Sequence, residues 1–174
     1  MILDGYWKKE LQQIRRDFLF WSKIGRVLSG DFPEHKINKD YLYSAVIIRK
    51  ISEDEKDAEN ELKEIGVPLP TFEISKIKVP VKRYNYVAAD KFFANSRVFL
   101  DDYNTKNAID DNISLFTACN QIIHSYAWSV IYRRKRIFGV LLASDREKEK
   151  DILLLSVKDW ITVIEEVIDK ANID

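Results

Sequence analysis

The sequence is poor in the residues that mark most specialised classes of protein. Its 174 residues include one cysteine, four prolines and five glycines. One cysteine cannot close an intrachain disulfide, which fits a reducing cytosol, and so little proline and glycine excludes collagen-like and low-complexity chains. The longest apolar runs, 45–48 and 140–143, are far shorter than the roughly 20 residues of a membrane span, and the N-terminus lacks the order of a signal peptide. We therefore expect a cytoplasmic protein without membrane contact.

The chain also lacks an excess of either charge. Its 28 Lys and Arg residues balance 28 Asp and Glu residues, so no long-range field attracts a polyanion. With 46% hydrophobic and 32% charged residues, the composition is that of a folded globular protein. We expect a single domain over 1–174. Neither a His/Cys cluster with zinc spacing nor a nucleotide-binding loop occurs, so we expect no metal and no cofactor.

Hydrophobic periodicity predicts a helical part over about 1–125. Apolar residues recur at three-, four- and seven-residue spacing and predict one long helix over about 3–29, which Gly30 would end. We expect a loop over 31–38 before the next helix.

Asp40 is the expected start of a second helix, which has apolar residues on more than one side as far as Ile51. The stretch 52–64 then has seven acidic residues against two lysines. A solvated continuation of the helix explains this better than a partner surface does. After it, 68–87 predicts short extended pieces, which Pro80 would confine to an edge or a loop.

The last third of the chain predicts helices and strands in alternation. Asp110–Asn112 offers N-cap side chains for a helix through Ser125. Apolar segments and charged turns over about 126–155 then predict a three-stranded antiparallel meander. A capping box opens a closing helix over about 156–172. The predicted class is α+β: a mainly helical bundle with a small C-terminal sheet and a closing helix.

The most informative residues surround His124. Asn120 precedes it by four residues, so both lie at one boundary of the predicted helix with Cβ atoms about 5–6 Å apart. An amide in this position can fix the imidazole tautomer while the other ring nitrogen faces a cleft. Cys119 lies on the apolar face of the same helix. The other histidine, His35, is expected at the surface.

These features resemble the HEPN superfamily of helical domains. The resemblance rests on the long first helix, on the buried helix with Ile47-Ile48-Arg49-Lys50-Ile51, and on the late Asn120-x-x-x-His124 pattern. Ribonuclease members of the family have Arg, a polar residue that is often Asn, three variable positions and His. Asn120 and His124 match the last two conserved positions, whereas Cys119 occupies the arginine position. The expected fold is thus a HEPN-like bundle, although the strands lie outside the minimal family fold.

The resemblance implies metal-independent RNA cleavage across a homodimer in the active members. There the histidine would move the proton of the 2′-hydroxyl or of the leaving oxygen, and the arginine would stabilise charge on the phosphorane. A thiol has one weak donor and no positive charge, and the loss of such a charge costs orders of magnitude in rate. We therefore expect a catalytically degenerate, homodimeric domain. It would act as an RNA-associated or protein-interaction module, related to toxin or defence systems.

Two alternatives stay open. In the first, the chain is an active metal-independent endoribonuclease, and His124 and Asn120 work with an arginine from another element. The arginines considered are Arg15, Arg16, Arg49 and those of the turn over 133–136. In the second, the domain is purely an interaction domain, and His124 is an ordinary structural residue.

A basic turn, Arg133-Arg134-Lys135-Arg136, is the other candidate site. It would contact RNA phosphates, with bases stacking on Tyr126, Trp128 and Tyr132 of the preceding strand. The competing explanation is that a charged turn keeps a hairpin soluble and discourages edge-to-edge pairing.

Overall fold

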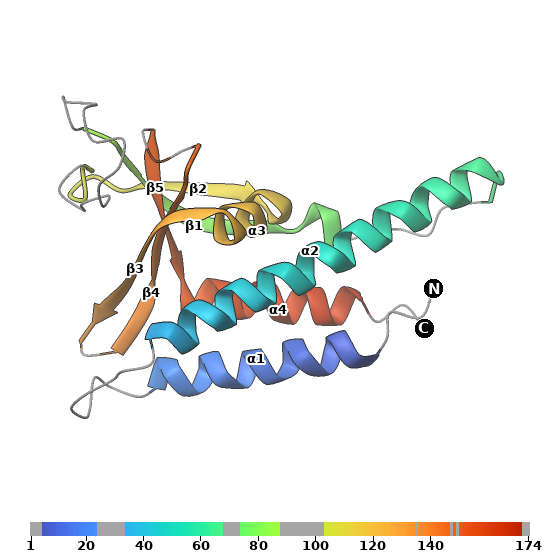
Figure 1. The fold of residues 1–174 in the computed structure, drawn as a ribbon, viewed down its shortest axis with the longest axis horizontal. Coiled ribbons are helices and arrows are strands. Elements are labelled where there is room, and N and C mark those ends of the chain that lie inside the picture. Colours follow the sequence, from blue (N-terminus) through green and yellow to red (C-terminus); the bar gives the residue numbers. More distant parts are fainter. Residues whose placement is uncertain are drawn as a thin grey trace.

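The computed structural model describes residues 5–23, 34–67, 74–87, 103–134, 136–146, 148 and 150–171. Within these residues the chain forms an α+β fold, as predicted, with helices packed on an antiparallel sheet (Figure 1). The elements in chain order are α1 (Gly5–Lys23), α2 (Glu34–Glu64), the 3-10 helix η1 (Ile74–Lys76), β1 (Lys78–Asn85), β2 (Ile109–Ser114), α3 (Leu115–Ile123), β3 (Ser125–Arg133), β4 (Arg136–Ser144), β5 (Asp151–Ser156) and α4 (Val157–Lys170).

The helix boundaries correct two predictions. The loop predicted over 31–38 is wrong from Glu34 onward, because α2 begins there rather than at Asp40. The predicted end of the first helix, over 24–30, lies outside the described residues. Within the described residues, no helix combines the length and the apolar character needed to cross a bilayer.

The sheet is larger than predicted. Its five described strands are antiparallel and lie in the order β2-β1-β5-β4-β3. The prediction of a three-stranded sheet is therefore wrong: β3, β4 and β5 are neighbours in it, and β1 and β2 extend it beyond β5.

The segment that the sequence predicts as a helix start is instead the strand β2, because its acidic residues pair with basic residues of β1. The supposed cap residues Asp110 and Asp111 lie in β2 and pair across the ladder with β1, through Lys82 at 2.5 Å and Arg83 at 2.7 Å. The helix cap is Ser114 instead, whose side chain accepts a hydrogen bond from the first turn of α3. The acidic pair therefore holds two strands together rather than starting a helix.

Pro80 lies in a strand with neighbours on both sides, which the prediction of an edge or a loop did not anticipate. In β1 it pairs with Asn112 of β2, but the pairing of β1 with β5 begins only at Lys82. At Pro80, β1 therefore has one partner strand, β2. On the β5 side no ladder is present at this position, so the missing N–H of Pro80 interrupts none there.

The core explains the apolar pattern of β5. Alternate residues of a strand point to opposite faces of a sheet. Leu153 and Leu155 join the helix-covered core, and Ile152 and Leu154 join a smaller cluster on the other face with Tyr103. Because both faces are covered, the strand is apolar throughout instead of alternating.

Aromatic rings join the helices to the sheet at the centre of the molecule. The buried ring of Tyr41 packs against Phe18 at 4.8 Å, Trp128 at 5.7 Å and Trp160 at 6.1 Å between centroids. The indole of Trp160 donates a hydrogen bond of 2.9 Å to the Ser44 hydroxyl. These contacts fix α1, α2 and α4 on one face of the sheet.

The closing helix α4 begins as predicted. The Ser156 hydroxyl oxygen accepts a hydrogen bond of 3.0 Å from the Asp159 N–H, and the Asp159 carboxylate in turn accepts the hydroxyl proton. The carboxylate half of the capping box thus differs from the expected contact with a backbone N–H.

Helix α2 has a buried half and a solvated half. All of its buried residues lie between Ile37 and Ile51, and the acidic stretch 52–64 has none. In Figure 1 this second half projects beyond the body of the molecule. The predicted solvated continuation is therefore confirmed.

Candidate functional site

Helix α3 carries Cys119 and Asn120 of the predicted site, and it packs against α2. Cys119 is fully buried on its inner face. Burial raises the pKa of this thiol to about 12, against a smaller opposite effect of Arg49, so the side chain stays a neutral thiol. Cys119 is therefore a residue of the hydrophobic core.

A guanidinium from another element does reach this helix. The Arg49 Nη1 atom of α2 donates a hydrogen bond of 3.0 Å to the Asn120 Oδ1 atom. The Arg49 Nε atom also forms an ion pair of 2.9 Å with Glu53, one turn along α2. The guanidinium lies over the Phe116 ring, 5.4 Å from its centroid, and the side chain is 33% exposed. Of the arginines considered from the sequence, Arg49 is the one that the structure brings to Asn120.

The two arginines of α1 that the sequence analysis considered contact other residues. Arg15 forms an ion pair with Glu165 of α4. Arg16 donates a hydrogen bond of 2.7 Å to Gln13 on its own helix.

His124 lies just beyond the end of α3. The helix ends at Ile123, so its predicted continuation through Ser125 is wrong, because Ser125 begins β3. As C-cap residue, His124 donates its backbone N–H to the Asn120 carbonyl at 2.9 Å, and its side chain is exposed. Arg49 thus contacts the Asn120 side chain. Among the described residues, no hydrogen bond or ion pair joins Arg49 or the Asn120 side chain to the His124 imidazole.

The basic turn is remote from this site. Arg133, Arg134 and Arg136 are exposed, and Lys135 lies outside the described residues. The Arg133 guanidinium lies 3.8 Å from the centroid of the Phe138 ring. The nine residues of β3 separate the turn from His124 by about 30 Å. The two predicted sites thus lie at opposite ends of one strand.

Two aromatic residues of the strand that leads to the basic turn pack against the core. Trp128 packs edge-on against Tyr41. Tyr132 packs against the main core, and its hydroxyl donates a hydrogen bond of 3.2 Å to Glu34. The side chain of Tyr126 lies outside the described residues. Trp128 and Tyr132 are partly buried against the core, so only part of each ring is exposed for the base stacking that the sequence predicts.

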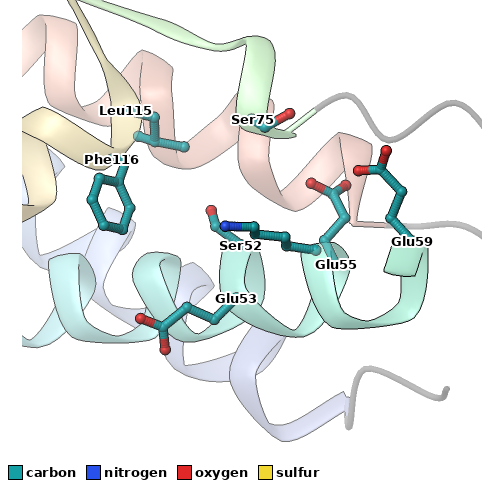
Figure 2. Close-up of a pocket in the computed structure, with 8 residues that line it drawn as sticks. Ser52, Glu53, Glu55, Glu59, Ser75, Leu115 and Phe116 are labelled. Atoms are coloured by element: carbon teal, nitrogen blue, oxygen red, sulfur yellow. The ribbon is translucent and has the colours of Figure 1, made fainter. Parts of the chain in front are cut away.

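A pocket of about 490 Å³ adjoins the Arg49–Asn120 contact. It lies between the charged half of α2, η1 and the first turn of α3 (Figure 2). Its charged lining residues all come from α2 and are three glutamates and one lysine: Glu53, Glu55, Glu59 and Lys56. Leu115 and Phe116 of α3 supply its apolar lining.

Sequence reasoning missed this pocket and two of its residues. The position of Glu53, four residues after Arg49, was a signal for the ion pair between them. No signal placed Phe116 near the guanidinium, because that contact depends on how α3 packs on α2.

Among the described residues, no group of three or more His, Cys, Asp or Glu side chains is placed to hold a metal ion. Comparisons with protein-family models, with curated proteins and with solved structures found no match.

Proposed function

We propose that this chain is a cytoplasmic, catalytically degenerate HEPN-like domain that acts as a protein-interaction module related to toxin or defence systems. The observation that supports this most is the environment of Arg49. A guanidinium stabilises a phosphorane best when no carboxylate opposes its charge. Arg49 instead donates to Asn120, and the Glu53 carboxylate opposes its charge. Cys119 adds no charge because it is a buried thiol.

Charge favours a protein partner over RNA at this site. The stretch 52–64, with seven acidic residues and two lysines, has a net charge of −5 and continues directly from Arg49 on the same helix. This negative field repels phosphates. The exposed basic turn lies at the other end of β3 from His124, about 30 Å along the strand.

Incubation of the purified chain with labelled single-stranded RNA in EDTA tests this proposal. We expect no cleavage, and RNA binding that Arg49→Ala leaves unchanged. Cleavage that is lost in both Arg49→Ala and His124→Ala, at unchanged melting temperature, would contradict the proposal.

A second candidate function is metal-independent endoribonuclease activity, and the 3.0 Å contact between Arg49 and Asn120 favours it. Here Arg49 would replace the missing family arginine beside Asn120 and His124. Glu53→Gln separates the two candidates, because it removes the carboxylate that opposes the guanidinium. An active site would cleave RNA at least about tenfold faster or slower in this variant.

Asp54→Asn is the matched control for Glu53→Gln. It removes one negative charge and one ion pair, with Lys50 at 2.7 Å, from the next position on α2. We expect neither variant to cleave RNA.

We also propose that the domain forms a homodimer through the outward face of α2. Leu42 and Val46 lie one turn apart on this face and are each 45% exposed. A two-fold contact would bury both pairs. We expect Leu42→Glu/Val46→Glu to be monomeric by light scattering at concentrations where the wild type is dimeric. Ile65→Glu is the control, because Ile65 is 71% exposed at the far end of the helix. A wild type that is monomeric throughout would contradict this proposal.

A further inference from the structure

The pocket beside α3 has an apolar end and an acidic end. Figure 2 shows Leu115 and Phe116 at one end, while Glu55 and Glu59 direct their carboxylates together at the other. Its volume of about 490 Å³ lies within the range of about 300–1,000 Å³ that is typical of ligand sites. This arrangement fits a group with an apolar body and a cationic head.

Phe116 already serves as a surface for a cation. Its ring is 50% exposed, and the Arg49 guanidinium lies over it at 5.4 Å. Aromatic faces attract cations through the ring quadrupole. An aliphatic side chain that covers the exposed part of the ring would also gain by burial.

The negative charge of α2 favours a positively charged ligand. Glu55 and Glu59 lie one turn apart, Glu59 pairs with Lys63 at 2.5 Å, and Lys56 also lines the pocket, where three glutamates outnumber it. The stretch 52–64 has a net charge of −5 in a chain whose total charge is zero. Electrostatic complementarity of this kind favours a basic partner and speeds its association.

We infer that this pocket is the docking groove for a basic segment of a partner protein, with Lys or Arg next to an aliphatic anchor. The anchor packs on the exposed part of the Phe116 ring, and the cation meets Glu55 and Glu59. A peptide suits the groove better than a small amine, because the acidic stretch continues along α2 beyond the pocket and offers further contacts to successive cations. The inference rests on the proposed function, since it names the partner chemistry of an interaction module.

Fluorescence anisotropy with a labelled peptide, Gly-Lys-Lys-Leu-Arg-Lys-Gly, tests the groove on the full chain. We expect saturable binding that weakens about tenfold in Glu55→Gln/Glu59→Gln and in Phe116→Ala. The matched controls are Glu61→Gln/Glu64→Gln, which removes the same charge from the same helix outside the pocket, and Phe20→Ala, an exposed aromatic residue of α1. Both controls should change affinity less than about threefold.

The inference would be overturned if the peptide showed no saturable binding, or if the two double glutamate variants lost affinity equally. It would also be overturned if a peptide with Ser in place of Leu bound as tightly as the original. Equal displacement by spermine in wild type and Phe116→Ala would also overturn it, because the site would then be an acidic surface alone. Failure here leaves the dimerisation and RNA results unaffected. Conversely, RNA cleavage that needs Arg49 would overturn the proposed function while the peptide still reports on the groove.

Discussion

Asp40 is a single residue whose surroundings oppose its charge. Partial burial between helices, and then repulsion from Asp17, raise the pKa of its carboxyl to about 6. The folded state therefore binds this proton more tightly than the unfolded chain, whose carboxyl has an ordinary pKa near 3.8. Stability falls as the pH rises from about 4 to about 6, and the full penalty persists at neutral pH.

We predict that Asp40→Asn stabilises the protein at pH 7.5 and loses most of this gain at pH 4. With an allowance for solvent screening of a half-exposed group, the gain at neutral pH is about 1 kcal/mol, or a few degrees in melting temperature. Thermal unfolding at the two pH values measures it. The exposed Asp57→Asn on α2 is the control and should change little. An equal gain at both pH values would show that the titration of Asp40 is not the cause.

The candidate site shows what single residues reveal before the fold is known. The apolar position of Cys119 on the helix wheel correctly predicted a core residue rather than a reactive thiol. Because Cys119 carries no charge, a cation beside Asn120 has to come from another element. The sequence alone does not identify which arginine supplies it. Arg49 lies 71 residues from Asn120 along the chain, so their contact exists only through the packing of α2 on α3.

At the scale of elements, β4 and β5 approach closely at Gly139. A Cβ atom built there would lie 2.4 Å from the Leu155 carbonyl oxygen and 2.9 Å from the Ser156 Cα atom. Both neighbours are backbone atoms of a central strand, so they cannot move aside as a flexible side chain would. Any side chain at this position pushes the two strands apart.

We predict that Gly139→Ala lowers the free energy of unfolding by about 2–3 kcal/mol, measured by urea denaturation. Gly66→Ala is the matched comparison. It has open space around it and a φ of 68°, so only the backbone penalty of about 1 kcal/mol applies. A smaller loss at Gly139 than at Gly66 would contradict the role of strand contact.

The elements differ in how well local patterns predicted them. β3 has an alternating period, β4 and β5 are short apolar runs bounded by charged turns, and α4 has a helical period; the sequence predicts all four within a few residues. β1 and β2 were missed as a pair because Pro80 suggests an edge or a loop and Asp110 and Asp111 suggest a helix cap. Their strand partners lie far away in sequence, and those partners make these residues compatible with a sheet.

At the scale of the whole molecule, stability is unevenly distributed along α2. The helix has 31 residues and is about 46 Å long. Its first half packs in the main core, whereas 52–64 has no buried residue and projects from the body (Figure 1). Side-chain pairs such as Lys63–Glu59 support this half by only a few tenths of a kcal/mol each.

Hydrogen exchange should therefore divide this helix. We predict that the amides of 53–64 exchange at least about a hundredfold faster than those of 41–51, because local fraying opens them without unfolding of the core. Exchange monitored by mass spectrometry or NMR measures this. Uniform protection along the helix would show that a partner copy or another contact covers the acidic half.

The sequence by itself determined the class of the fold, the buried and solvated halves of α2 and the packed state of Cys119, because each depends on local periodicity or side-chain polarity. The tertiary structure decided which arginine meets Asn120, where the two early strands insert and where the acidic pocket lies. These features depend on contacts between segments tens of residues apart, and such contacts form only when the helices and the sheet share one core.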